Sequence, residues 1–205
     1  MRYFDFRTKL EGLPVFNLTD IRKIDSGFHN PQLTYWQEKG WVRPIAGGYY
    51  VFGDTQITPV LLNIVANKIV QPSYVSLESS LAYYQIIPER VYGVTSVTSK
   101  KTSRFESDWG FFSYRSLKPS LMFGYDVART DWGGAFLIAS LEKTVLDYLY
   151  LNSHIDSFED FEELRWEQES LMMLRHNALF DSMLERFNKK ALNYRVDQLM
   201  RYLNA

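Results

Sequence analysis

Apolar residues recur every three or four positions through much of the first forty residues, which is the spacing of one face of a helix. The pattern predicts three short helices, over residues 4–10, 18–24 and 31–39. Gly40 can end the third helix, because glycine readily takes the left-handed conformation that commonly follows a helix. Two short segments rich in β-branched and aromatic residues, 41–45 and 49–52, then predict a hairpin. Three helices followed by a hairpin are typical of a winged helix-turn-helix, which we expect over residues 1–54.

The third predicted helix has an apolar side and a polar side. At about 100° per residue, Leu33 and Trp36 fall together and are expected to face the core. Asn30 precedes the helix and is expected to cap it, with Pro31 preset for the first turn. The opposite side carries groups able to hydrogen-bond to base edges in the major groove. Those groups are Thr34, Tyr35 and, at the border, Gln32.

Beyond residue 54 the pattern predicts a second domain over 55–205, which makes the chain an α+β protein of two domains. β-type segments joined by short linkers predict a largely antiparallel sheet, with strands over 91–98, 104–106, 110–117, 122–127 and 135–139. Periodic apolar segments predict flanking helices over 58–68, 76–84, 140–151, 158–164, 177–187 and 190–203. Ser76 is expected to cap the second of these helices, and Pro88 to close it.

Composition and charge narrow the class of protein. The chain has 205 residues, no cysteine and a net charge of −1. Without cysteine it forms no disulfides, thiolate zinc sites or cysteine nucleophiles, and a cytoplasmic location is expected. The sequence shows neither a membrane-spanning segment nor a signal-peptide pattern, so no membrane partner is expected. Residues 1–53 carry seven basic against five acidic side chains, which is a weak electrostatic indication of nucleic-acid binding.

Residue patterns that carry enzyme chemistry are missing from the sequence. His29, His154 and His176 lie far apart and have no ligand-like spacing. The sequence contains no phosphate-binding loop, dinucleotide-binding glycine fingerprint or nucleophile-elbow motif. A solvated helix face explains the acidic run 159–163 better than a catalytic or metal-binding pair does. We therefore expect no enzyme activity, no cofactor and no bound metal.

A group of basic residues lies in two neighbouring β-type segments and their loops. Its members are Lys100, Lys101, Arg104, Arg115 and Lys118. Serine and threonine hydroxyls are interleaved with them, as are Phe105, Phe112 and Tyr114. Basic groups with hydroxyls suit contact with phosphate, and aromatic rings can stack on bases. The alternative interpretation is a solvated sheet face whose aromatic side chains point into the core.

Two blocks of sequence carry a resemblance to a known family. One is Leu33-Thr34-Tyr35-Trp36-Gln37-Glu38-Lys39-Gly40-Trp41-Val42, continued by Gly48-Tyr49-Tyr50-Val51-Phe52. The more specific block covers 72–84, 87–89 and 94–102, and continues in Tyr114-Arg115 and in Ile138-Ala139-Ser140-Leu141-Glu142-Lys143-Thr144-Val145-Leu146-Asp147-Tyr148-Leu149. With these blocks the chain resembles the AbiEi family of bacterial antitoxins and transcriptional regulators, from type IV toxin–antitoxin (abortive infection) systems.

The resemblance implies an N-terminal winged helix that binds operator repeats in double-stranded DNA and represses its own operon. It also implies a C-terminal domain that counters a nucleotidyltransferase-like toxin, either by binding it or only functionally. DNA contact is then expected at Asn30, Gln32, Thr34, Tyr35, Lys39, Arg43 and Tyr49. Lys39 and Arg43 would hold phosphates, and Gln32 is suited to a bidentate contact with adenine.

Two features of the sequence favour a different role. The segment 44–48 contains no basic residue, although wings of the family usually carry one, and the net charge is close to zero. Both features favour a protein-interaction module that binds a partner such as the toxin through the winged helix and the basic sheet region. A DNA-binding repressor and antitoxin is the leading hypothesis, and the interaction module is the alternative.

Overall fold

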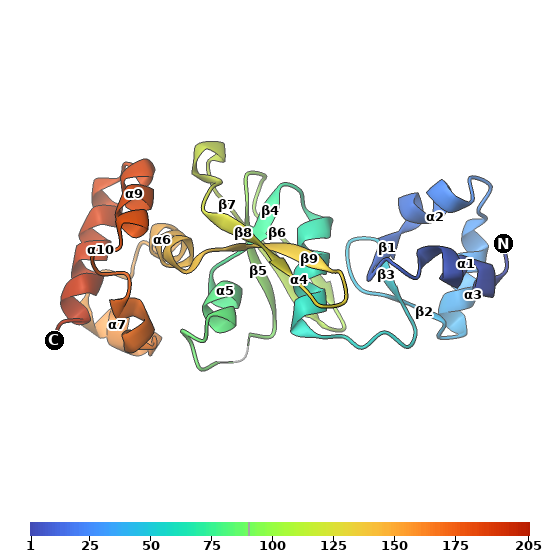
Figure 1. Ribbon diagram of the computed structural model, residues 1–205, viewed down its shortest axis with the longest axis horizontal. Coiled ribbons are helices and arrows are strands. Elements are labelled where there is room, and N and C mark those ends of the chain that lie inside the picture. The colour runs from blue at the N-terminus through green and yellow to red at the C-terminus, as the bar shows by residue number, and fades with distance from the viewer. Residues whose placement is uncertain (90) are drawn as a thin grey trace.

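The chain forms an elongated molecule in which a small N-terminal unit, a central sheet and a group of C-terminal helices follow one another along the long axis (Figure 1). The computed structural model describes residues 1–89 and 91–205. We use "N-terminal unit" for residues 1–54, which lie at one end of the molecule. The chain termini lie toward opposite ends (Figure 1).

Short helices and a three-stranded sheet make up the N-terminal unit. Its elements are α1 (Tyr3–Leu10), β1 (Phe16–Asn17), α2 (Leu18–Ile24), α3 (Asn30–Glu38), β2 (Val42–Pro44) and β3 (Tyr49–Phe52). The strands lie in the order β1-β3-β2, and both pairings are antiparallel. The helices and the hairpin expected from the sequence are confirmed. The sequence pattern does not indicate β1, because a strand of two residues has no alternation to detect.

The start of α3 differs from the expected one. The helix begins at Asn30, so the cap position falls on His29, whose side chain makes no capping hydrogen bond. The Gln32 N–H donates to the His29 carbonyl at 2.9 Å, which draws Asn30 into the first turn. The prediction that Asn30 caps the helix is therefore wrong. Gly40 follows the helix with a φ of +70°, as a C-terminal glycine is expected to do.

A six-stranded sheet occupies the middle of the described structure, in the order β6-β7-β5-β4-β9-β8. Its strands are β4 (Ser73–Val75), β5 (Gly93–Thr98), β6 (Ser103–Ser107), β7 (Gly110–Ser116), β8 (Tyr125–Arg129) and β9 (Ala135–Ala139). The sheet is mixed, because β5 pairs with β7 and β4 with β9 in parallel, while the other neighbours are antiparallel. Short linkers predict hairpins between successive strands. The expectation of a largely antiparallel sheet fails at β5, which pairs in parallel with β7 instead of forming a hairpin with β6, the next strand in the sequence.

Helices lie on both faces of this sheet, and the last ones in the chain pack on α6 (Leu141–Leu151) at the end of the molecule (Figure 1). The helices are α4 (Pro59–Ile69), α5 (Glu78–Tyr83), α6, α7 (Phe158–Leu164), α8 (Gln168–Met172), α9 (Ala178–Phe187) and α10 (Lys190–Tyr202), with the 3₁₀ turn η1 (Pro119–Leu121). Leu61 and Val65 of α4 pack with Val75, whereas Tyr74, which precedes Val75, belongs to the cluster formed with α5, α6 and the C-terminal helices. Neighbouring residues of a strand point to opposite faces, so the molecule has a core on each side of the sheet.

The start of α5 corrects a second capping prediction. Ser76 does not cap this helix, because its hydroxyl donates instead to the Asp147 carboxylate at 3.0 Å. The cap position falls on Leu77, which is buried and has a φ of +58°. The helix ends at Tyr83, well before Pro88, so the proline does not close it.

The N-terminal unit packs on α4 through one face of its small sheet. Val15, Ile45 and Val51 belong to the same buried cluster as Leu61 of α4. The Tyr49 hydroxyl donates to the backbone carbonyl of Lys68 at 3.0 Å, near the end of α4. The helix α3 lies on the far side of the unit, away from the central sheet (Figure 1). Within the described residues, none of the helices has the length and apolar character needed to cross a membrane.

Candidate nucleic-acid interface

The helix α3 is held firmly by its apolar side and presents its polar side to solvent. Leu33 and Trp36 are 3% and 2% exposed, as the sequence predicts. The Trp36 ring lies 4.5 Å from the Phe6 ring and 5.6 Å from the Phe28 ring, between centroids, so α1 and the α2–α3 turn both fix the helix. On the opposite side, Thr34 and Tyr35 are exposed. This geometry leaves the outer face of α3 open to a partner.

An aromatic group flanks this outer face. The Tyr35 ring meets the Trp41 ring edge-on with centroids 6.1 Å apart, and Trp41 also lies 4.8 Å from Tyr3. The Tyr3 hydroxyl donates to the Trp41 carbonyl at 3.0 Å, which connects α1 to the residue just before β2. The Lys39 ammonium lies 5.6 Å from the centre of the Tyr35 ring. A cation and partly exposed rings therefore stand together at the C-terminal end of α3.

The preceding helix adds basic side chains that sequence reasoning missed. Arg22 and Lys23 are exposed on α2, and the Arg22 guanidinium donates to the Asn30 side-chain oxygen at 3.4 Å. Asn17 and Asp20 form a capping box that fixes the start of α2. The signal was present in the sequence, because a helix-turn-helix brings the end of its first helix close to the start of its second. Asn30 and Arg22 thus form one edge of the candidate interface.

Gln32 has a different environment from the one expected for a base-reading side chain. Its amide nitrogen donates to the Met1 carbonyl at 2.6 Å, and the side chain is half-buried. A bidentate contact with adenine needs both the amide oxygen and the amide nitrogen. In this structure the nitrogen is already engaged, so Gln32 holds the start of the chain against α3.

Arg43 and Tyr49, the predicted contacts in the hairpin, both point into the molecule. Arg43 donates to the Thr55 carbonyl, and its guanidinium lies 5.1 Å from the centre of the Trp109 ring. Its Nε is buried and has no hydrogen-bond partner among the described residues. The Tyr49 hydroxyl is held by the Lys68 carbonyl of α4. Both side chains attach the hairpin to the rest of the protein and are not brought to the face of α3.

An ion pair holds the two ends of the N-terminal unit together. Arg7 of α1 donates through both terminal nitrogens to the Asp54 carboxylate, at 3.0 and 2.8 Å. The guanidinium lowers the pKa of Asp54 by hydrogen bonding to its charged form. The pair is exposed, and its effect is to connect α1 with the residues that follow β3.

The basic residues of the central sheet divide into free and engaged groups. Lys100, Lys101 and Lys118 are exposed, and the Leu117 N–H donates to the Thr98 carbonyl at 2.8 Å, which places their loops side by side. Arg104 pairs with Glu106 at 2.6 Å and lies 4.0 Å from the centre of the Phe111 ring. Arg115 donates to the Leu151 carbonyl at 2.8 Å. The three lysines can meet a partner, whereas the two arginines serve contacts within the protein.

A buried polar network lies on the face of the central sheet that packs against α5 and α6. Lys143 forms an ion pair with Asp147 one turn later on α6, and both side chains are 0% exposed. The Asp147 carboxylate also accepts from the Tyr74 hydroxyl at 2.8 Å and from Ser76 at 3.0 Å. Burial raises the pKa of Asp147 and lowers the pKa of Lys143, because it disfavours both charged forms. Sequence reasoning missed this network.

The structure thus brings Asn30, Thr34, Tyr35 and Lys39 to one outer surface, and it draws Gln32, Arg43 and Tyr49 into contacts within the chain. The residues described in the structure contain no cluster of three or more His, Cys, Asp or Glu side chains suited to a metal ion. Comparison with known proteins found neither a family model nor a curated protein that matches the chain.

Proposed function

We propose that the N-terminal unit is a winged helix-turn-helix that binds double-stranded DNA, with α3 in the major groove and the β2–β3 hairpin as the wing. The observation that carries this proposal is the exposed outer face of α3, with Thr34 and Tyr35 outward and Trp36 fixed in the core. A major groove about 12 Å wide admits one helix, and α3 lies at the end of the molecule that is remote from the central sheet (Figure 1).

The environments of the side chains refine the proposed roles. Thr34 and Tyr35 present hydroxyls to base edges, and Lys39 contacts phosphate. Arg22 supports Asn30 and adds a second positive charge near the backbone of the DNA. Gln32 and Arg43 act within the protein in this structure, so we remove both from the proposed contacts. The hairpin then contributes shape and packing more than charge.

The resemblance to AbiEi proteins extends the proposal to an antitoxin. The chain would repress its own operon from operator repeats, in the cytoplasm, and residues 55–205 would counter a nucleotidyltransferase-like toxin. The sequence block that carries this resemblance contains the buried residues Tyr74, Ser76, Lys143 and Asp147, which form one network. That network joins β4 to α6 and so stabilises the domain that would carry the antitoxin activity.

A protein-interaction module is the second candidate, and one observation favours it. Arg43, the basic residue of the β2 strand, is turned away from the outer surface, while Lys100, Lys101 and Lys118 gather at one end of the central sheet. A negatively charged partner protein would meet these three lysines. Such contacts act mostly on association rate and on salt dependence, because they are exposed.

Fluorescence anisotropy with a labelled duplex from the region upstream of the gene tests the DNA proposal. An unrelated duplex of equal length measures non-specific binding. Lys39→Gln is compared with Lys101→Gln, which removes another exposed lysine, from the loop between β5 and β6. We expect Lys39→Gln to weaken binding to both duplexes and to reduce the slope of log K against log salt by about one unit, with Lys101→Gln unchanged.

Two outcomes separate the candidates. Equal affinity of the wild type for both duplexes, or equal loss in the two lysine variants, contradicts sequence-specific binding through α3. Co-purification with the protein encoded by the adjacent gene tests the interaction module. A complex that is weakened by Lys101→Gln and left unchanged by Lys39→Gln supports that second candidate.

A further inference from the structure

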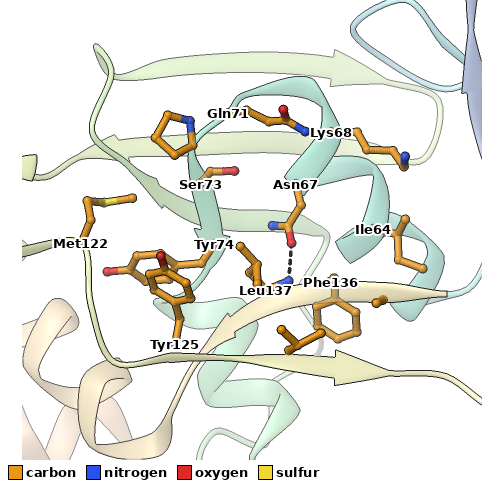
Figure 2. Close-up of a pocket in the computed structure, with 13 residues that line it drawn as sticks. Ile64, Asn67, Lys68, Gln71, Ser73, Tyr74, Met122, Tyr125, Phe136 and Leu137 are labelled. Carbon is orange, nitrogen blue, oxygen red and sulfur yellow. Dashed lines mark hydrogen bonds between the residues drawn. The ribbon is translucent and has the colours of Figure 1, made fainter. Parts of the chain in front are cut away.

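A cavity of about 590 Å³ opens beside the central sheet where β4 and β9 separate (Figure 2). Within the described residues these two parallel strands share a single register pair, Val75 with Ile138. Toward the start of β9 the two strands have no further register pair, and α4 contacts both of them. The volume is in the range of small-molecule sites, which is roughly 300–1,000 Å³.

The two sides of this cavity differ in polarity. The side formed by α4 and the segment that follows it contributes the polar side chains Asn67, Lys68, Gln71 and Ser73, interspersed with Ile64, Pro72 and Tyr74. The opposite side is mainly apolar and is formed by β8, β9 and the segment before them. Its side chains are Met122, Tyr125, Val127, Ala135, Phe136 and Leu137. Figure 2 shows Asn67 near the centre of the view, with Lys68 extending toward the upper right, Met122 at the left, Tyr125 at the lower left and Phe136 at the lower right. A ligand that fits both sides has a polar head and an apolar body.

Asn67 supplies a hydrogen-bond donor that has no acceptor. Its side-chain oxygen accepts the Leu137 N–H, which fixes the orientation of the amide (Figure 2). Its Nδ2 is buried and has no partner among the described residues. Buried donors are rarely left unpaired, because an unpaired donor lowers stability. A hydrogen-bond acceptor on a ligand can pair with this nitrogen after a small movement of the side chains that line the cavity.

The charge of the lining indicates the charge of the head. Lys68 is the one charged side chain among the described lining residues, and no carboxylate faces the cavity. We propose that the cavity binds a small organic acid, with its carboxylate at Asn67 and Lys68 and its apolar or aromatic body against Met122, Val127 and Phe136. The site lies apart from α3, so it is tested without DNA and goes beyond the function proposed above.

Isothermal titration with three acids, 3-phenylpropionate, indole-3-acetate and octanoate, tests this site. Each acid is paired with its neutral amide. Asn67→Asp keeps an oxygen for the Leu137 N–H and replaces the free donor with an acceptor, so we expect acid binding to weaken by at least about tenfold. Lys68→Gln removes the charge and should reduce the preference for acid over amide. Lys118→Gln, an exposed lysine outside the cavity, serves as the matched control.

Val127→Trp provides a second test that leaves the polar side intact. Val127 is 52% exposed and lines the cavity, so a larger side chain can occupy the space without disturbing a core. We expect this variant to keep the thermal stability of the wild type and to lose acid binding. Absence of saturable binding by all three acids overturns the proposal. Amide binding as tight as acid binding, or undiminished acid binding in both Asn67→Asp and Val127→Trp, overturns it equally.

Discussion

Lys143 and Asp147 form an ion pair within α6 that is completely withdrawn from solvent. Three aromatic rings surround the ammonium, which lies 5.4 Å from the ring centre of Tyr74, 5.0 Å from Phe123 and 4.9 Å from Phe187. The pair thus connects β4, the segment before β8, and α9 to α6. Because these elements are far apart in the sequence, the pair fixes how the sheet and the C-terminal helices pack.

Loss of one member of this pair is expected to destabilise the protein strongly. Asp147→Asn keeps the size of the side chain but leaves the Lys143 ammonium buried without a counter-charge. A buried pair that loses one partner costs about 3–5 kcal/mol in the free energy of unfolding. Urea unfolding followed by circular dichroism measures this change.

Two further variants show whether the cost comes from the isolated charge. Lys143→Met in the Asp147→Leu background removes both charges, so much of the loss should be recovered, although Tyr74 and Ser76 lose their acceptor. Glu106→Gln breaks the exposed pair with Arg104 and should change stability by less than about 1 kcal/mol. A loss below about 1 kcal/mol in Asp147→Asn would contradict the buried-charge explanation.

The local structure of this chain is largely predictable from its sequence. The strand β9 and the helices α2 and α7 have the predicted bounds. Helix periodicity is a local signal, so it survives without knowledge of the fold, whereas the caps expected at Asn30 and Ser76 do not form. The position of β7 between β5 and β6 is not local. Strand pairing depends on which apolar faces meet across the sheet, and short linkers alone do not reveal it.

The candidate site shows the same division between local and tertiary information. The spacing of Leu33 and Trp36 predicts which side of α3 is buried, and this is confirmed. Gln32 bonds to Met1, which is 31 positions away in the sequence, and Arg43 bonds to Thr55, which is 12 positions away. No local pattern indicates either contact. Lys143 and Asp147 look like an ordinary surface pair at i,i+4, and only the surrounding packing buries them.

Gln32 and Thr34 are expected to differ in their effect on DNA recognition, if α3 reads the operator as proposed. Gln32→Ala removes a contact with Met1 and should leave base preference nearly unchanged, because the amide is already engaged. Thr34→Val keeps the shape of an exposed side chain and removes its hydroxyl, so discrimination at one base pair should fall by about 1–3 kcal/mol. Binding to a set of single-base operator variants measures both effects. The reverse result would mean that Gln32 leaves Met1 when DNA binds.

The turn of the β2–β3 hairpin is expected to tolerate a methyl group at one glycine better than at the next. Gly48 has a φ of +79° and open space around its missing Cβ, so Gly48→Ala should cost about 1–2 kcal/mol for the left-handed backbone alone. Gly47 has a φ of +58°, and a Cβ there would lie 2.8 Å from Cγ2 of Ile69 on α4.

Gly47→Ala should therefore destabilise the protein more than Gly48→Ala does. The measurement is urea unfolding of both variants. Addition of Ile69→Ala should reduce the difference between them, because it removes the atoms that meet the new methyl group. Equal losses in Gly47→Ala and Gly48→Ala would show that the hairpin can move away from α4 at little cost.

The start of α7 is expected to make stability depend on pH through Asp160. Its carboxylate accepts the N–H groups of Asp156 and Ser157 at 3.0 Å and the Ser157 hydroxyl at 2.8 Å. These hydrogen bonds hold the pKa of Asp160 below its ordinary value of 3.8, and the bond from the Asp156 N–H has the largest effect. Between the lowered value and 3.8 the unfolded chain binds more protons than the folded one, so stability rises with pH in that interval.

The contribution of Asp160 is therefore complete above its unfolded pKa and is lost as the pH falls through the folded pKa. Asp160→Asn should be less stable than the wild type near neutral pH, and the difference should shrink on acidification. Ser157→Ala keeps the carboxylate and both backbone donors, so it should retain most of the pH dependence while lowering stability at every pH. Urea unfolding at a series of pH values compares the three proteins. Parallel pH profiles for the wild type and Asp160→Asn would show that the α7 cap does not depend on the charge of Asp160.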